Sequence, residues 1–288
     1  MKKNKKQRPA VRIPTSIRFV VWLSQRISSA LATKVALYLF FRPQRFKTPV
    51  REHQMRDAAE QIKFYASSIQ KEIQVYRLNG KKQKVLLLHG WSGRGTQLFS
   101  FADELQKQNC EVITFDMPAH GQSPGNKTNV LELAYCIKDL NQKFGPFDAA
   151  IAHSMGSFAL LRAIKDGLPL QSAAILGSGD SIKGVFYRFS QQLHFSDKIA
   201  ERMITTVEKQ FSTKLETYSS SMSIKEIDIP LLIVHDKDDK EAPYECSTTL
   251  HDLARNSQLK LTSGLGHHRI LRDPKTVQYI VQFLLQYP

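Results

Sequence analysis

Residues 149–161 have the sequence AAIAHSMGSFALL, and this segment indicates the fold of the whole chain. The apolar run at 149–152 predicts a short buried strand, and the longer apolar stretch after Ser154 predicts a helix. A serine in a sharp turn from strand to helix has its hydroxyl exposed at the end of the strand, provided that its neighbours are small. Gly156 fits this requirement, and Ala152 stands where a glycine is more usual. Ser154 is therefore a candidate nucleophile.

From residue 51 the chain alternates between strand and helix patterns. Runs typical of strands lie at 73–78, which alternates apolar and polar residues, and at 84–88, 111–115, 149–152, 173–176, 230–235 and 258–262. Continuously apolar strands that alternate with helices predict a mostly parallel sheet with helices on both faces, here an α/β fold of about eight strands. The pair Asn79-Gly80 predicts a hairpin between the first two runs, which would give the sheet an antiparallel edge.

Three parts are expected along the chain. Residues 1–50 form a basic tail and an amphipathic helix, residues 51–180 and 224–288 form the α/β core, and residues 181–223 form a helical cap inserted between two strands. The cap segment contains many apolar side chains and no strand-like run. Because substrate pockets are usually lined by apolar groups, Phe186 and Phe189 are predicted to line a pocket above Ser154.

A serine hydroxyl needs a base to remove its proton, and the base needs an acid to orient it. In a parallel sheet such groups lie at the carboxyl ends of the strands. Asp239 and His267 follow two late strands in the chain order Ser, Asp, His that this architecture favours. The sequence leaves other candidates open, namely Asp180, Asp236 and Asp238 for the acid and His268 for the base. The spacing Gly264-Leu-Gly-His favours His267.

Two backbone N–H groups are needed to stabilise an oxyanion. Met155 follows the candidate nucleophile at a helix N-terminus, and Trp91 follows a His89-Gly90 pair at the end of a strand, so both are predicted donors. His89 and His120 are expected to hold the loops around this site. No ligand spacing predicts a metal, and the glycines at 90–95 do not have the spacing of a nucleotide site. No cofactor is expected.

Together these motifs resemble those of the α/β-hydrolase superfamily over residues 73–288, as in bacterial members of unassigned substrate. The matching segments are Leu86–Trp91, Phe115–Ser123, the turn at Ser154, Ile233–Asp239 with Pro243, and Gly264–His267. The resemblance implies a serine hydrolase with a Ser-Asp-His triad. The chain departs from the pattern at Ala152 and at Asp236, where glycine is frequent, and neither change removes a catalytic group.

The sequence leaves two classes of function open. The first is a serine hydrolase that cleaves an ester or thioester of a small to medium apolar acyl group through an acyl-enzyme. Acyl transfer, amide cleavage, carbon–carbon hydrolysis and peroxide formation use the same triad. The second is a non-catalytic protein of this fold that uses the cap and the basic helix for binding. A dehalogenase or epoxide hydrolase would have an Asp nucleophile, which the serine at 154 argues against.

The positive charge is concentrated at the N-terminus. Of the 41 Lys and Arg residues, 12 lie in residues 1–50, which contain no Asp or Glu, leaving 29 basic against 26 acidic groups in the remainder. Residues 1–12 are polar and are expected to be disordered. The next segment, to residue 47, mixes apolar runs with spaced cations. It has neither the roughly 20 uncharged residues that span a bilayer nor the apolar core of a secretory signal.

This segment has three possible roles, which the sequence leaves open. A helix packed on the domain, a peripheral contact with anionic lipid and nucleic-acid binding are all compatible with the charge. Because no base-reading motif accompanies the charge, nucleic acid is not an expected partner. Three widely spaced cysteines suit a reducing compartment, so we expect the chain in the cytoplasm, with possible attachment at the inner face of the membrane. The oligomeric state is not indicated.

Overall fold

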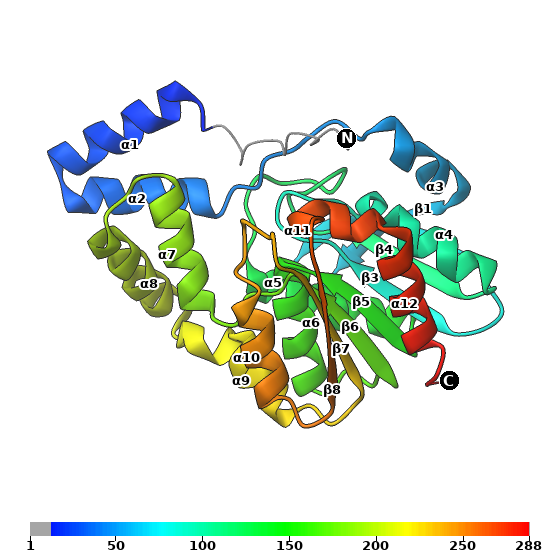
Figure 1. The fold of residues 1–288 in the computed structure, drawn as a ribbon. Helices are drawn as coiled ribbons and strands as arrows, with labels where there is room; N and C mark the ends of the chain where they lie inside the picture. The colour runs from blue at the N-terminus through cyan, green and yellow to red at the C-terminus, as the bar shows by residue number, and fades with distance from the viewer. Residues whose placement is uncertain (1–12, 288) are drawn as a thin grey trace, which may run out of the picture.

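The computed structural model describes residues 13–287, which are built around one eight-stranded sheet (Figure 1). The strand order is β1-β2-β4-β3-β5-β6-β7-β8, with antiparallel pairing of β1 with β2 and of β2 with β4 and parallel pairing elsewhere. The strands are β1 Glu60–Ala66, β2 Lys71–Leu78, β3 Lys84–Leu88, β4 Glu111–Asp116, β5 Ala149–His153, β6 Ser172–Leu176, β7 Leu231–Asp236 and β8 Ser257–Thr262. The predicted mostly parallel α/β sheet is confirmed.

Helices cover both faces of the sheet, so its central strands are apolar on both sides. Leu86 and Leu88 of β3 belong to one buried cluster, while Val85 and Leu87 belong to the other. The first cluster includes residues of α5 (Val130–Phe144), α6 (Met155–Lys165) and α10 (Glu245–Leu253). The second includes residues of α3 (His53–Ala58), α4 (Phe99–Lys107) and α12 (Pro274–Leu284). Burial on both faces explains why these strands are continuous apolar runs in the sequence.

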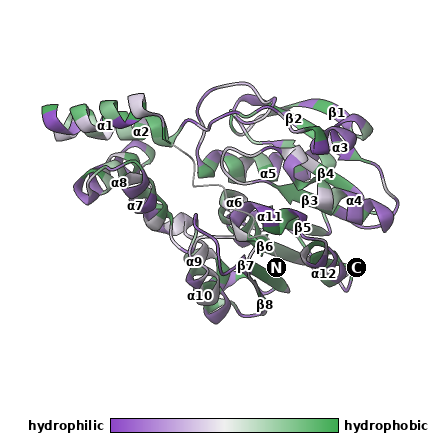
Figure 2. Ribbon diagram, turned by 45° about the horizontal axis from the view of Figure 1, so that its top comes forward, coloured by the Kyte–Doolittle hydropathy of each residue, from purple (hydrophilic) through white to green (hydrophobic). Residues whose placement is uncertain are grey.

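A separate helical layer lies beside the sheet at the cap (Figure 2). It consists of α7 (Ile182–Gln192) and α8 (Asp197–Phe211), together with α1 (Thr15–Ile27) and α2 (Ser29–Phe40). The short α9 (Ser220–Ser223) lies against α6 and α10 instead. The N-terminal segment thus forms two helices rather than one. Ser28 separates them, and its hydroxyl accepts a hydrogen bond from Leu31 N at 3.1 Å. The Phe40 ring of α2 stacks on Phe186 of α7 with centroids 4.2 Å apart.

Residues 13–287 contain no helix that is long and apolar enough to cross a membrane. The tail at residues 1–12, for which we predict disorder, lies outside the described residues.

The hairpin predicted at Asn79-Gly80 is wrong. Because β4 lies between β2 and β3, the segment after β2 crosses over instead of turning back. The backbone N–H groups of Lys81 and Lys82 both donate to Asn109 O, at 2.9 and 3.0 Å. A Cβ on Gly80 would lie 2.2 Å from the carbonyl carbon of Cys110, so the glycine allows a close backbone approach. The antiparallel edge comes instead from β1, which pairs with β2 through a turn at residues 67–70.

We predict that Gly80→Ala lowers the free energy of unfolding by about 1–3 kcal/mol, because the added methyl group meets backbone that must shift. Gly184→Ala is the matched control. It lies within α7, where a Cβ would closely approach only the guanidinium end of Arg188, at 3.1 Å, and would have an ordinary contact with Ser181, at 3.7 Å. In a helix the same change is favourable by roughly 0.5–1 kcal/mol. Urea unfolding measures both variants, and equal stability of the two would contradict the packing argument.

Candidate active site

Ser154 occupies a strained turn between β5 and α6. Its backbone has φ 52° and ψ −118°, a region that residues with a side chain rarely adopt. Gly156 makes the turn possible, because a Cβ there would lie 2.7 Å from His89 O and 2.9 Å from Leu88 O. Ala152 is fully buried in β5, so the alanine in place of glycine fits within the sheet. The turn places the Ser154 side chain at the carboxyl end of the strand.

The loop after β3 closes over this turn. A Cβ on Gly90 would lie 2.9 Å from the Cβ of Ser154, so only glycine allows this approach. His89 holds the loop: its Nδ1 donates to Gly90 O at 2.7 Å, and its Nε2 accepts from Met117 N at 3.0 Å. Burial lowers the pKa of His89 well below its ordinary value, which keeps the ring neutral.

Of the two predicted oxyanion donors, Met155 directly follows Ser154, and Trp91 directly follows Gly90, where an added Cβ would lie 2.9 Å from the Cβ of Ser154. Among the hydrogen bonds of residues 13–287, none engages the backbone N–H of Trp91 or of Met155. Met155 is the first residue of α6, where the N–H groups of a helix have no partner within the helix. Both groups are therefore available to an oxygen bound next to Ser154.

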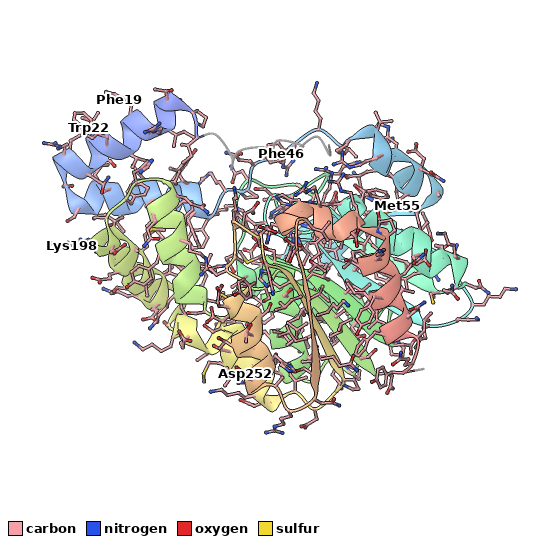
Figure 3. The ribbon with its side chains drawn as sticks, viewed as in Figure 1. Phe19, Trp22, Phe46, Met55, Lys198 and Asp252 are labelled. Carbon is pink, nitrogen blue, oxygen red and sulfur yellow. The ribbon has the colours of Figure 1, made fainter. Side chains whose placement is uncertain are left out.

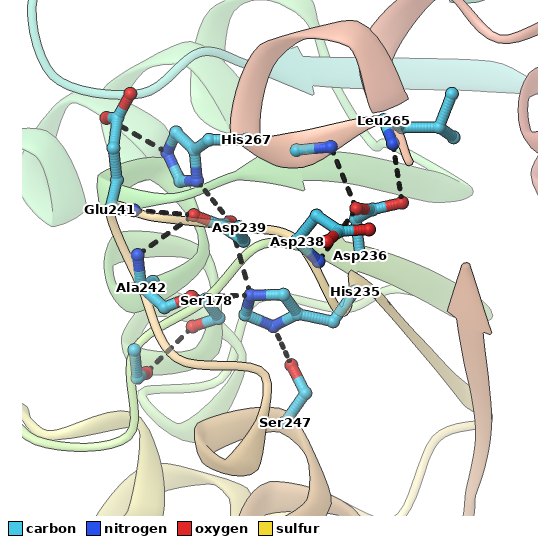
Figure 4. Close-up of polar contacts among 12 residues, drawn as sticks. Ser178, His235, Asp236, Asp238, Asp239, Glu241, Ala242, Ser247, Leu265 and His267 are labelled. Carbon is cyan, nitrogen blue, oxygen red and sulfur yellow. Dashed lines mark hydrogen bonds and ion pairs between the residues drawn. The ribbon is translucent and has the colours of Figure 1, made fainter. Parts of the chain in front are cut away.

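Asp239 and His267 form a close pair (Figure 4). Asp239 Oδ2 accepts from His267 Nδ1 at 2.6 Å and lies 3.2 Å from His235 Nε2. Asp239 Oδ1 accepts from the backbone N–H of Glu241 and Ala242, at 2.8 and 3.0 Å. Burial acts to raise the pKa of Asp239, but the hydrogen bonds from His235 and His267 outweigh it and hold the pKa well below its ordinary value. An ionised Asp239 keeps the proton of His267 on Nδ1, which leaves Nε2 free to act as a base.

This pair lies next to the turn at Ser154. The backbone N–H of Ser154 donates to Leu176 O at 2.8 Å, and the following residue, Gly177, lies against the His267 ring. A Cβ on Gly177 would be 3.2 Å from two ring atoms of His267 and 3.5 Å from Asp239 Oδ2. The structure thus brings all three predicted residues to the carboxyl end of the sheet.

The Ser154 hydroxyl and His267 are not hydrogen-bonded to each other within residues 13–287. Instead, Glu241 Oε2 lies 3.7 Å from His267 Nε2, the atom that would accept the serine proton. Hydrogen bonds between catalytic groups often form only once substrate is bound. Glu241 was not singled out from the sequence, because an acidic residue in a Lys- and Glu-containing loop resembles a solvated surface position.

His268 contacts a different carboxylate. Its Nε2 lies 2.9 Å from Glu241 Oε1, and its side chain is 54% exposed, against 6% for His267. The hydrogen bond to Glu241 raises the pKa of His268. Among the described hydrogen bonds, the only carboxylate that His267 contacts is that of Asp239. The geometry therefore favours His267 over His268 as the base and Asp239 over its alternatives as the acid.

Asp236 has a positioning role that the sequence did not reveal. Its Oδ1 accepts from the backbone N–H of Gly266 at 2.8 Å, and its Oδ2 accepts from that of Leu265 at 3.1 Å (Figure 4). A further bond from Thr262 Oγ1, at 2.7 Å, ties the same carboxylate to the end of β8. Asp236 therefore fixes the loop that carries His267. From the sequence it was a departure from glycine and an alternative acid; the informative signal was a carboxylate at a strand end facing a glycine-rich loop.

The expectation that Phe186 and Phe189 line the substrate pocket is not supported by their contacts. Both rings pack against Phe40 of α2, with centroids 4.2 and 5.0 Å away. A cleft that borders Asp239 is lined from α7 by other residues, Arg188, Gln191 and Gln192, and from the chain after β7 by residues 237, 240, 241 and 243–245. Phenylalanines 186 and 189 belong to the apolar contact between α7 and α2, and the residues that line the cleft mostly have polar or charged side chains.

Metal ligands do not cluster in the part of the chain that the structure describes, where no group of three or more His, Cys, Asp or Glu side chains could hold an ion. Its three cysteines are free and buried.

A family model described as alpha/beta hydrolase fold matches residues 84–178, which run from β3 through the Ser154 turn to the end of β6. Over these residues the chain is similar to the alpha/beta hydrolase family, and its sheet has the α/β-hydrolase fold. Among curated proteins, lysophosphatidylserine lipase ABHD12 of Danio rerio is 24% identical over 265 residues. The match covers 81% of this chain and 63% of that protein, so the chain spans less than two thirds of its relative.

Solved structures of an esterase and a putative lipase have the same fold. An esterase from Pyrococcus furiosus superposes with a TM-score of 0.64 at 16% identity, covering 86% of this chain and 97% of that one. A putative lipase from Acinetobacter baumannii AYE gives a TM-score of 0.62 at 20% identity, covering 85% and 98%. At these identities the likeness establishes the α/β-hydrolase fold over most of the chain.

The hydrogen bonds of Asp236 predict a pH-dependent contribution to stability. Burial acts to raise the pKa of Asp236, but the bonds from Gly266 N, Thr262 Oγ1 and Leu265 N outweigh it, so the pKa lies below the ordinary 3.8. A depressed pKa stabilises the folded state above the unfolded value, and this stabilisation is lost as the pH falls through the folded value. We predict that Asp236→Asn lowers the free energy of unfolding by about 2 kcal/mol at pH 7. The gap from the wild type should shrink below about pH 4.

Asp252→Asn is the control, because Asp252 is exposed on α10. Urea unfolding at several pH values should show little difference between this variant and the wild type. The assignment of Asp236 as an ionised, hydrogen-bonded carboxylate would be contradicted if the difference in unfolding free energy between the wild type and Asp236→Asn stayed constant or widened as the pH falls.

Proposed function

We propose that this chain is a serine hydrolase that cleaves an ester or thioester of a small to medium apolar acyl group through an acyl-enzyme. Ser154 is the nucleophile, His267 the base and Asp239 the acid. The observation that carries the proposal is the strained backbone of Ser154, held at φ 52° between the Gly90 loop and the His267–Asp239 pair. Strain of this kind at a serine in a turn from strand to helix is typical of an activated nucleophile.

The reaction follows from these positions. His267 Nε2 takes the proton of the Ser154 hydroxyl as its oxygen attacks the substrate carbonyl, and the N–H groups of Trp91 and Met155 stabilise the oxyanion. Collapse of the tetrahedral intermediate breaks the ester bond, and His267 gives its proton to the departing alcohol or thiol. Water then attacks the acyl-enzyme with His267 again as the base, which releases the acid and restores Ser154. Throughout, the ionised Asp239 stabilises the positive charge of His267.

Two surfaces that border members of the proposed site suggest how an ester is oriented. The half-buried side chains of Trp91 and Met155 offer apolar contact for the acyl part. The cleft beside Asp239, with Arg188, Gln191 and Gln192 on one wall, offers polar contact for the alcohol part. The lysophosphatidylserine named for the zebrafish relative supports this division, because it joins an acyl chain to a polar headgroup.

A non-catalytic binding protein of the same fold is the alternative, and one observation favours it. Glu241 Oε2, rather than the Ser154 hydroxyl, is the polar group 3.7 Å from His267 Nε2.

Transfer of the acyl group to an acceptor other than water would use the same acyl-enzyme, and product analysis with added alcohols separates it from hydrolysis.

We predict that a fluorophosphonate probe labels the wild type and spares Ser154→Ala. Ser154→Ala and His267→Ala should each lower turnover of p-nitrophenyl esters by about 10³-fold or more, because members of a triad act as a unit, whereas Asp239→Asn should have a smaller effect. The panel should run from short esters to acyl-CoA thioesters and lysophospholipids, so that it also identifies the preferred acyl length.

His268→Gln is the matched control, since His268 contacts Glu241 and not Asp239. It should keep turnover within about threefold of the wild type, because it removes no member of the triad. Loss of labelling in His268→Gln with full labelling of His267→Ala would reverse the base assignment. A folded wild-type protein that neither reacts with the probe nor turns over any ester would favour the binding protein.

A further inference from the structure

Helix α1 is apolar on two sides, although only one side packs against the protein. Val21 is buried and Ile17 half-buried in the apolar cluster that joins α1, α2 and the cap. The opposite side exposes Phe19 at 58%, Trp22 at 52% and Ile27 at 62%. A surface helix normally has one apolar stripe, which faces the core, and charged or polar residues on the other side. The outer side of α1 therefore requires a separate explanation (Figure 3).

The exposed apolar side chains form a continuous patch and are not scattered. Of the 13 large apolar side chains exposed among the described residues, nine lie between residues 19 and 50. We call six of them the α1 surface: Phe19, Val20, Trp22, Leu23, Ile27 and Leu31. Phe19 and Trp22 stack with ring centroids 6.0 Å apart, and a shallow apolar groove between α1 and α2 adjoins them, lined by Val20, Val35 and Leu39. Single exposed apolar residues are ordinary, whereas a patch of this kind marks an interaction surface.

The segment that forms the α1 surface carries several cations and no acidic residue. Residues 13–50 contain Arg18, Arg26, Lys34, Arg42, Arg45 and Lys47 and no Asp or Glu. Arg26 lies over the Trp22 ring, 5.5 Å from its centroid, and Arg18 and Lys34 are exposed. The sequence adds six more Lys and Arg residues in 1–12. Aromatic and aliphatic side chains bordered by cations match the boundary of an anionic bilayer, where the rings enter the interface and the cations meet lipid phosphates.

We propose that the α1 surface binds the interface of a bilayer that contains anionic lipid. The helix lies parallel to the membrane, with Phe19, Trp22 and Ile27 inserted at the level of the headgroups. Arg18, Arg26 and Lys34 contact lipid phosphates. The other side of the helical pair stays bound to the cap, where Phe40 stacks on Phe186. Two ties to the loop before α8 fix α1 as well, because the Gln25 side chain donates to His194 O and accepts from Ser196 N, at 3.1 and 3.0 Å.

The test uses the purified full chain and vesicles. Co-sedimentation compares phosphatidylcholine vesicles with vesicles that contain about 30% phosphatidylglycerol, at about 0.05 and 0.5 M salt. The wild type should bind the anionic vesicles at low salt and bind them several-fold more weakly at high salt. Trp22 fluorescence should shift to the blue on binding, and a Trp22→Phe variant should lose that shift.

Paired variants separate the apolar part from the electrostatic part. Phe19→Ser/Trp22→Ser should weaken binding to anionic vesicles by about tenfold or more, because two aromatic anchors are removed. Arg18→Gln/Arg26→Gln should reduce the preference for anionic over neutral vesicles. Tyr65→Ser is the matched control, because Tyr65 is 61% exposed on edge strand β1 and should bind as the wild type does.

Three results would overturn the proposal. The first is equal binding of the wild type to neutral and anionic vesicles. The second is a loss of vesicle binding in Tyr65→Ser as large as that in Phe19→Ser/Trp22→Ser. The third is a wild-type dimer that the Phe19→Ser/Trp22→Ser variant converts to a monomer without any change in vesicle binding. The last result would make the α1 surface an interface between two copies of the chain. Hydrolysis of a short water-soluble ester should be unchanged in every variant, so the outcome is independent of the proposed catalytic function.

Discussion

The left-handed backbone of Ser154 is the constraint on which the rest of the site depends. Such a conformation costs about 1–3 kcal/mol for a residue with a side chain, and it persists only where the surroundings over-determine it. Here Gly90 and Gly156 leave space for the turn, and the bond from Ser154 N to Leu176 O ties it to β6. The central strands that hold it are buried on both faces of the sheet. The apolar sequence of β5 and the strain at its end are therefore two parts of one arrangement.

Two carboxylates, one at the end of β7 and one just after it, position His267. Asp239 binds the imidazole itself, at 2.6 Å, while Asp236 binds the backbone N–H groups of Leu265 and Gly266 just before it. Both are kept ionised by hydrogen bonds that outweigh the effect of burial on their pKa values. His235, near the end of the same strand, donates to Asp239 and is fully buried. The orientation of the base thus depends on a small network of buried hydrogen bonds. A single exposed ion pair would hold the base less firmly than this network does.

The parts of this arrangement that are local in sequence were predictable, and the parts that join distant segments were not. The strands β3 to β7 were visible because burial on both faces leaves continuous apolar runs, and Ser154, Asp239 and His267 were visible because each lies in a short motif at a strand end. Strand β1 was missed because Gln61, Lys63 and Tyr65 of this edge strand are exposed. Asn79-Gly80 predicted a hairpin from local preference, but the order of strands in the sheet is set by tertiary packing. The contact of Phe186 with Phe40 joins residues far apart in the chain, and no pattern in either segment indicates it.

Helix α7 connects the two functional surfaces that the structure suggests. On one side Phe186 and Phe189 hold Phe40 of α2, and on the other Arg188, Gln191 and Gln192 line the cleft beside Asp239. A helix built in this way fixes the distance and angle between the α1 surface and the cleft, because its apolar side packs densely and resists sliding. If the α1 surface lies on a bilayer, α7 sets how far the polar wall of the cleft stands from the headgroups.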